Sequence, residues 1–255
     1  MSKYALVLGI CALFANSALA HEDDPKILDR RPHYRGAGYR GAAAADPQKF
    51  GLTVQTTGSA ISFPASNVQL LSWLPIGDFG TFETSANDCW GYVSPSGTEY
   101  ALMGLSESTA FISLADPTDP EIVAVISGPS SMWRDVKTYQ EFAYSVSEGG
   151  SGIQVFDLTQ IDSGTVTQVN TITTGGATTA SHNVAIDEAS GRLYRLGGGS
   201  EGMRIYDLAN PANPVFIGSW MDRYIHDAQY HTYTSGPFAG RQICYASSGF
   251  NGGFT

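Results

Sequence analysis

The sequence predicts an all-β protein built from repeated units. Charged residues make up only 15% of the 255 residues, and Gly numbers 29. This composition favours strands joined by tight turns over helices. No window combines the apolar i, i+3, i+4, i+7 spacing of an amphipathic helix with helix-forming residues. Two separate sets of similar segments recur at intervals of 44 to 50 residues, and such a period is typical of repeat folds.

The first set consists of apolar runs with a short polar residue in fourth place. The runs span 110–114, 154–158 and 204–208, and the polar residues are Ser113, Asp157 and Asp207. Short acceptors at strand ends commonly bond to the backbone of the turn that follows. We therefore expect a structural role for these three side chains.

The second set lies upstream of the first and has a similar period. Its members are Asp88, Asp135, Asn183 and Asp227, at intervals of 47, 48 and 44 residues. Two independent registers with similar periods are difficult to obtain by chance. Both therefore mark the same structural repeat.

Each repeat contains four short strand-like runs, which in the second repeat span about 135–139, 142–146, 153–158 and 166–172. Glycines in the connections supply the positive φ angles that tight hairpins need. A four-stranded antiparallel unit every 40 to 50 residues is typical of a propeller blade. The sequence thus predicts a β-propeller, incomplete in this chain, with about three full blades and part of a fourth. The blades span about 86–126, 133–172, 181–220 and, incomplete, 225–255. A β-sandwich is the alternative, but it would not need so regular a period.

The N-terminal segment is predicted to direct export. Residues 1–20 form a signal peptide, with Lys3 at the start, an apolar stretch and a small-x-small cleavage pattern ending at Ala20. Cys11 weakly suggests a lipoprotein signal instead, but the bulky Ile10 before it argues against that. The apolar stretch is too short for a membrane span, so we expect no transmembrane helix in the mature chain.

The next segments are predicted to be a flexible leader at 21–66 and a closing strand at 67–74. The leader is charged or of low complexity, and little in it could bury a core. Residues 67–73 resemble 214–220, the last strand of a repeat, yet they precede the first one. Propellers often close by pairing an N-terminal strand with the final blade, which removes an open sheet edge. The partial propeller would therefore span 67–255.

Charge and cysteine content limit the partners. Acidic residues outnumber basic ones by 24 to 14, which makes nucleic acid an unfavourable partner. The exported chain keeps Cys89 and Cys244, which either form a disulfide or lie apart in the core. Two GxGxxG patterns, at 36–41 and 197–202, lack the strand and helix that a nucleotide site needs.

Several segments in order resemble one bacterial family. The segments are NVQLLSWLP at 67–75, NDCWGY at 87–92, WRDVK at 133–137, QVFDLT at 154–159, SHNV at 181–184 and HDAQ at 226–229. Together they resemble the choice-of-anchor B surface proteins built from LVIVD-type repeats, over most of 63–250. The resemblance implies an exported propeller held at the cell surface by a C-terminal anchor, which would lie in sequence beyond residue 255. It implies no established catalytic residues.

The second set of repeated residues is the candidate site. In a propeller the first strand of each blade lines the central channel, so Asp88, Asp135, Asn183 and Asp227 would form a polar ring that binds a ligand. Oxygen ligands could hold Ca²⁺, and the neighbouring His182 and His226, with Asp135 and Asp227, could favour another divalent metal. The alternative is structural, with each Asp bonding to the backbone of an adjacent segment. Repetition in every unit favours this structural role.

Three functions follow from these observations. The first is a surface or secreted binding module for an extracellular protein or a polysaccharide. The second is a metal-dependent hydrolase or lyase with its site at the channel, and the third is a passive spacer on the envelope. No HExxH or Walker-type motif is present. Trp73, Trp90, Trp133 and Trp220 are expected to pack between blades, with a carbohydrate-stacking surface as the alternative.

Overall fold

The described residues of the computed structural model form an all-β structure. They are 67–248 apart from 69, 177 and 199–201, together with 38–40, 52–56, 59–63 and 253–254. The predicted signal peptide lies outside them. Within the described part of the chain, no helix has the length and apolar character needed to cross a membrane.

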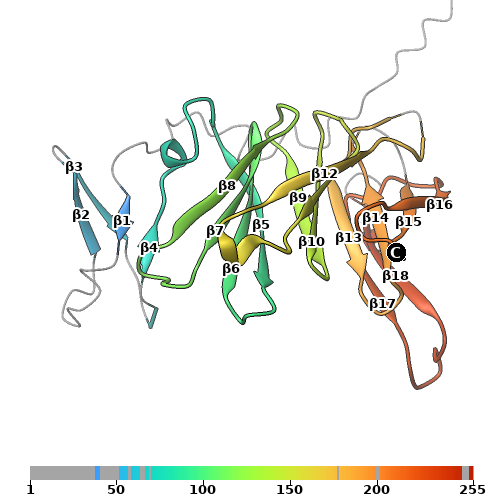
Figure 1. The fold of residues 1–255 in the computed structure, drawn as a ribbon. Coiled ribbons are helices and arrows are strands. Elements are labelled where there is room, and N and C mark those ends of the chain that lie inside the picture. Colours follow the sequence, from blue (N-terminus) through green and yellow to red (C-terminus); the bar gives the residue numbers. More distant parts are fainter. Residues whose placement is uncertain are drawn as a thin grey trace, which may run out of the picture.

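Four antiparallel sheets follow one another along the chain, and in each the strand order is the chain order (Figure 1). The first sheet contains β5 (Ala86–Val93), β6 (Glu99–Leu105), β7 (Ser108–Ser113) and β8 (Glu121–Ser127). The second contains β9 (Arg134–Tyr139), β10 (Phe142–Ser147), β11 (Ile153–Asp157) and β12 (Thr167–Ile172). The third contains β13 (Asn183–Asp187), β14 (Arg192–Leu196), β15 (Met203–Asp207) and β16 (Val215–Trp220). The fourth contains β17 (Asp227–Thr232), β18 (Gln242–Ser248) and β19 (Gly253–Phe254).

These sheets confirm the all-β prediction and the division into antiparallel units, of which the first three are four-stranded and the fourth has three strands among the described residues. In the second sheet the observed strand boundaries lie within about one residue of the predicted ones. The same irregularity recurs in the first three sheets, where the pairing of the third and fourth strands shifts register. It lies between Phe111 and Ile112, between Val155 and Phe156, and between Ile205 and Tyr206. A bulge at equivalent places bends each outer strand in the same way.

The predicted turn acceptors are also confirmed. Asp157 accepts a hydrogen bond from the amide of Thr159 at 2.8 Å, and Asp207 accepts one from Ala209 at 2.6 Å. Ser113 accepts a longer bond from Ala115 at 3.3 Å. Each side chain therefore fixes the backbone two residues beyond the end of its strand.

The core lies between consecutive sheets. Phe111 of the first sheet packs edge-on against Phe156 of the second, with ring centroids 5.2 Å apart. The second and third sheets share a similar cluster that includes Val155 and Tyr206, and the third and fourth share one that includes Tyr194 and Tyr230. Because each sheet buries its apolar face against the next, the sheets are placed in chain order.

The N-terminal strands lie beside the first sheet. β1 (Tyr39–Arg40) pairs with β4 (Ser72–Trp73), and β2 (Leu52–Thr56) pairs with β3 (Ser59–Phe63). β1, β2 and β3 fall within the predicted leader. Within the predicted closing strand at 67–74, the described residues form a strand only at Ser72–Trp73, and its partner is β1. The strand stops just before Pro75, which has no amide hydrogen to donate. The short 3₁₀ helices at Ile76–Asp78 and Ile161–Ser163 complete the described elements.

Tyrosine hydroxyls join each sheet to the next. The Tyr100 hydroxyl donates to Asp162 at 2.7 Å, and the Tyr144 hydroxyl donates to the carbonyl of Pro211 at 2.9 Å. The Tyr194 hydroxyl donates to Gln242 at 2.5 Å. Burial raises the pKa of Tyr100 to about 12, and the bond to Asp162 adds to the shift. Burial also raises the pKa of Tyr194 to about 12, with a contribution from the charge of Asp187.

Alkaline pH is therefore expected to destabilise the protein. The folded state keeps protons on Tyr100 and Tyr194 that the unfolded chain releases above pH 10. The contribution of these two groups to stability is therefore constant below pH 10 and falls between pH 10 and 12. We expect the melting temperature, followed by circular dichroism, to fall by roughly 5 °C over this range. The fall should be smaller in Tyr194→Phe, which has no hydroxyl to titrate. Equal falls in both proteins would contradict the assignment to Tyr194.

Candidate ligand pocket

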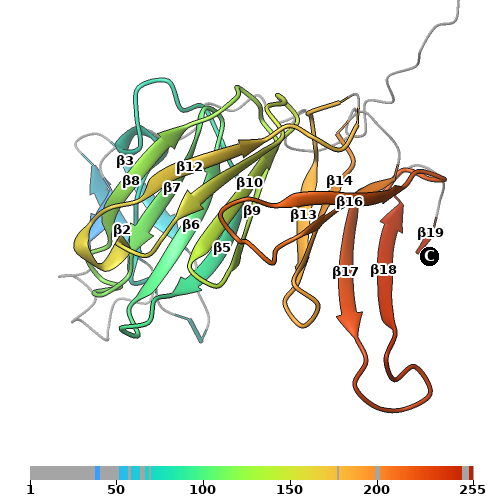
Figure 2. The same ribbon diagram turned by 45° about the vertical axis from the view of Figure 1, so that its right-hand side comes forward.

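A polar pocket lies along the first strands of the sheets. β5, β9, β13 and β17 neighbour one another in turn, and the β17–β18 hairpin projects beyond them (Figure 2). The pocket has a volume of about 460 Å³, within the usual range for small-ligand sites. Its lining residues are Asp88, Trp90, Asp135, Lys137, Thr138, Asn183, Val184, Ala185, Ile186, Glu188, Asp227, Ala228, Gln229, Tyr230, Tyr245 and Ser247.

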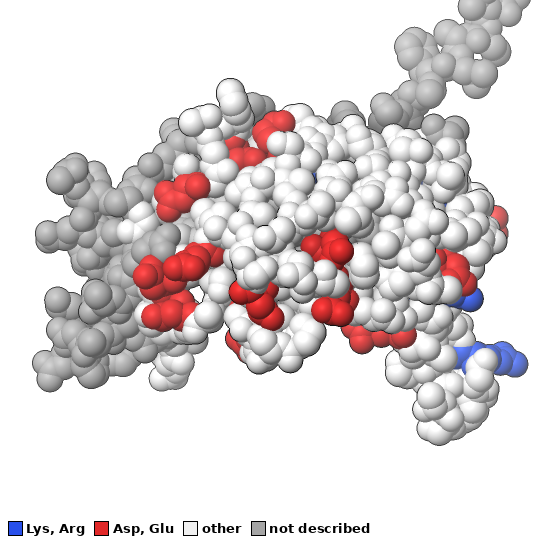
Figure 3. Space-filling model, in the orientation of Figure 1, with Lys and Arg blue, Asp and Glu red and all other residues white. Residues whose placement is uncertain are grey.

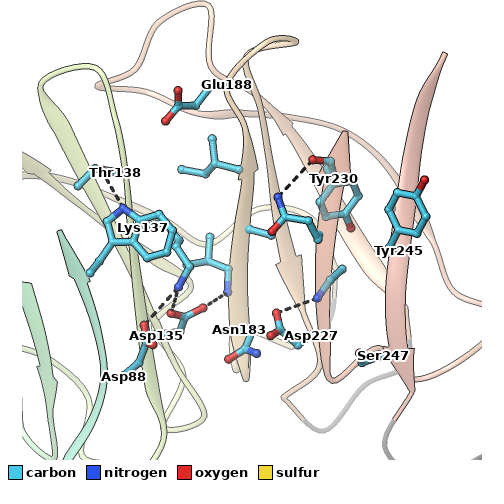
Figure 4. Close-up of a pocket in the computed structure, with 16 residues that line it drawn as sticks. Asp88, Asp135, Lys137, Thr138, Asn183, Glu188, Asp227, Tyr230, Tyr245 and Ser247 are labelled. Atoms are coloured by element: carbon cyan, nitrogen blue, oxygen red, sulfur yellow. Dashed lines mark hydrogen bonds and ion pairs between the residues drawn. The ribbon is translucent and has the colours of Figure 1, made fainter. Parts of the chain in front are cut away.

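All four residues of the second repeated set line this pocket (Figure 4). Asp88 and Asp135 lie on one side, with Lys137, while Asp227 and Ser247 lie on the other. Each of the four residues is at or near the start of the first strand in its sheet, and equivalent starts lie side by side. Asp88 has a φ of 57° beside a register shift in β5, a conformation that Asp tolerates better than most residues.

Two of the four side chains, those of Asp88 and Asp135, form hydrogen bonds that join neighbouring sheets. Asp135 accepts hydrogen bonds from the amide of Val184 in the third sheet at 2.8 Å and from its neighbour Val136 at 2.7 Å. Asp88 in turn accepts a bond from the amide of Val136 in the second sheet at 3.3 Å. These contacts agree with the structural alternative for Asp88 and Asp135, since each joins its sheet to the backbone of the next.

Lys137 forms ion pairs with Asp88 and Asp135 on the same side of the pocket. Its Nζ lies 2.5 Å from Oδ1 of Asp135 and 3.2 Å from Oδ2 of Asp88. Burial raises the pKa of Asp135, and the nearby Asp88 carboxyl adds to the shift. Burial also acts to raise the pKa of Asp88, but hydrogen bonds from Asp135 and attraction to Lys137 lower it overall. The two carboxylates likewise raise the pKa of Lys137 against the effect of its burial.

The side chains of Asn183 and Asp227 form no hydrogen bond to a neighbouring sheet among the described residues. The only hydrogen bond that Asp227 makes through its side chain within the described residues comes from the amide of its neighbour Ala228, at 2.7 Å. The Asn183 side chain makes none in the same part of the chain, and the equivalent bond from Ala228 to Asn183 is not formed. Half of the ring therefore lines the pocket with polar side chains that make no hydrogen bond to another sheet among the described residues.

The two histidines proposed as metal ligands lie elsewhere. Neither lines the pocket, because neighbouring residues at a strand point to opposite sides. His182 is buried, its Nδ1 lies 2.8 Å from Oε1 of Glu148, and its ring centroid is 4.2 Å from that of His226. Across the described residues, no three His, Cys, Asp or Glu side chains are grouped so that they could hold a metal ion. The set His182, His226, Asp135 and Asp227 is thus not brought together as one ligand sphere.

Sequence reasoning did not assign to the candidate site the residues two places after the ring. Trp90, Lys137, Ala185 and Gln229 all line the pocket. Side chains at i and i+2 of a strand share a face, so this spacing could have identified them. Trp90 was expected to pack in the core between blades, but 41% of it is exposed. Of the other tryptophans, Trp220 packs beside the cluster between the third and fourth sheets.

Cys89 and Cys244 are both free thiols. Cys89 is exposed and Cys244 is partly buried, and burial raises the pKa of the Cys244 thiol. No disulfide therefore joins them in the structure.

These features define a class of protein: sequential antiparallel sheets, three of four strands and one of three among the described residues, with a polar pocket along their first strands. Comparison with known proteins does not narrow this class. No family model matches the chain, and no curated protein matches it.

Proposed function

We propose that this chain is an exported binding module whose sheets are consecutive blades of a β-propeller. Three features support the propeller: the strand order within each sheet, the apolar clusters between consecutive sheets, and the adjacent first strands. The resemblance to choice-of-anchor B surface proteins supports a place at the cell surface, as does the N-terminal signal sequence.

The ligand is an extracellular protein or a polysaccharide that enters the pocket. The observation that carries this proposal is that four sheets contribute to one pocket in which Asn183 and Asp227 have no structural partner across the sheets. Asp and Glu are spread over the face shown in Figure 3, whereas Lys and Arg are confined to one end of it. Such a surface repels polyanions, so nucleic acid is an unfavourable partner.

Binding is expected to depend on Asn183 and Asp227, the two ring residues that form no hydrogen bond to another sheet among the described residues. The probes are two surface fractions of the producing organism, one of protein and one of polysaccharide, each passed over the immobilised chain. We expect at least one fraction to be retained, and the double variant Asn183→Ala, Asp227→Ala to weaken its binding by about ten-fold or more, because both polar contacts are lost. Surface plasmon resonance measures the change.

The matched control is Glu121→Ala, which removes an exposed carboxylate at the start of β8 outside the pocket. It should bind as the unmodified chain does. Equal binding by the double variant would show that the pocket is not the site. Retention of neither fraction by the unmodified chain would favour a passive spacer over a binding module.

A further inference from the structure

We propose that the pocket binds a neutral glycan, with Trp90 as the surface on which a sugar ring stacks and Asn183, Asp227 and Gln229 as the groups that bind its hydroxyls. This inference rests on the proposed binding function and narrows its ligand to one chemical class. It assigns separate tasks to the two sides of the pocket.

Trp90 is held in place without a ligand. Its Nε1 donates to Oγ1 of Thr138 at 3.1 Å, and Nζ of Lys137 lies 4.6 Å from the centroid of its ring. Both contacts come from β9 of the neighbouring sheet, while 41% of Trp90 remains exposed. An indole that is both fixed and exposed costs little conformational entropy when a flat apolar surface stacks on it. The apolar face of a pyranose ring is such a surface.

The opposite side of the pocket offers groups suited to hydroxyls. The Asn183 amide can both donate and accept, and the Asp227 carboxylate can accept from two neighbouring hydroxyls. Gln229 lies on the same face of β17 as Asp227. Within the described residues, its side chain makes only one hydrogen bond, a long one of 3.4 Å to the carbonyl of Tyr230. The Ser247 hydroxyl lies on the same side (Figure 4). An amide, a carboxylate and a hydroxyl around an aromatic ring match the alternating polar and apolar surface of a sugar.

The charge of the lining excludes acidic sugars. Asp88, Asp227 and Glu188 contribute negative charge, and Lys137 is the one basic residue among the lining residues. Its ammonium group is already paired with Asp88 and Asp135. No cation is therefore left in the lining to pair with a uronate carboxylate, which the aspartates would repel. Neutral sugars avoid this repulsion.

The test is isothermal titration of the whole chain with four hexasaccharides. Three are neutral, namely cellohexaose, xylohexaose and chitohexaose, and the fourth is the anionic hexagalacturonate. We expect at least one neutral oligosaccharide to bind and hexagalacturonate not to bind. Trp90→Ala should weaken binding of the neutral ligand by about ten-fold or more, because the stacking surface is lost.

Two further variants separate stacking from general damage. Trp90→Phe keeps an aromatic face and should recover most of the affinity lost in Trp90→Ala. Phe82→Ala removes an aromatic side chain that is 82% exposed and lies outside the pocket, so it should leave binding unchanged. Circular dichroism of each variant checks that its fold is retained.

The glycan inference is wrong if no neutral hexasaccharide binds, if hexagalacturonate binds best, or if Trp90→Ala keeps full affinity. Retention of the surface protein fraction through Asn183 and Asp227, without binding of any hexasaccharide, would leave the proposed binding function standing and overturn only the glycan. Failure to retain either surface fraction would overturn both.

Discussion

Replacing Asp135 with Ala is expected to lower the free energy of unfolding by about 3 to 5 kcal/mol. Asp135 is 3% exposed and accepts hydrogen bonds from the amides of Val136 and Val184 and from the Lys137 ammonium group. The substitution leaves the amide of Val184 without its acceptor, and it leaves Val136 and Lys137 with their longer bonds to Asp88, in a site that water scarcely reaches. Urea unfolding followed by circular dichroism measures the loss.

Asp227→Ala is the matched control for this prediction, since it removes the equivalent residue of the fourth sheet. The Asp227 side chain is exposed and accepts only from its own neighbour among the described residues. Its loss should change the free energy of unfolding by no more than about 0.5 kcal/mol. If the two variants lost similar amounts of stability, the division of the ring into a structural and a ligand-binding half would be wrong.

Replacing Arg134 with Ala is expected to have a similar effect, about 3 to 5 kcal/mol. The Arg134 side chain is fully buried between the first and second sheets. Its Nε donates to the carbonyl of Leu105 at 2.9 Å, its Nη2 donates to that of Pro129 at 2.5 Å, and its Nη1 donates to Gln154 at 3.2 Å. Removing the side chain leaves three acceptors unpaired and opens a cavity.

A second basic residue provides the comparison for Arg134. Arg192 forms a half-exposed ion pair with Asp207 at 2.6 Å, and such pairs contribute about 0 to 1 kcal/mol. Arg192→Ala should therefore cost about 1 kcal/mol or less in the same urea titration. Arg134→Met keeps most of the side-chain volume, so a smaller loss in this variant than in Arg134→Ala would measure the part due to the cavity. A loss below about 1 kcal/mol in Arg134→Ala would contradict the role of Arg134 in joining the sheets.

The repeat could be recognised from the sequence because it is a local property of the chain. The strand-like runs of the second unit, the Gly-containing connections and the acceptors Asp157 and Asp207 depend on residues within a few positions of one another. For this reason their prediction agrees with the structure. The common position of Asp88, Asp135, Asn183 and Asp227 could also be anticipated, since equivalent residues of equivalent units occupy equivalent places.

The sequence could not predict which of those four side chains form hydrogen bonds to the next sheet. Whether a carboxylate accepts such a hydrogen bond depends on a backbone amide 48 or 49 residues away, as in the bonds from Val136 to Asp88 and from Val184 to Asp135. The repeat favours the same bond in every unit, yet the bond to Asn183 is missing. In the same way, the separation of His182 and His226 from the carboxylates follows from which side of the strand each residue faces.

The sequence by itself thus determined the period, the strands and the shared position of Asp88, Asp135, Asn183 and Asp227 along the first strands, because these follow from local patterns of apolar, polar and Gly residues. Only the tertiary structure decided which of these residues are occupied by sheet-to-sheet hydrogen bonds, and that Trp90 is fixed and exposed instead of buried. The reason is that such contacts join residues of different sheets, and their geometry exists only when the sheets pack.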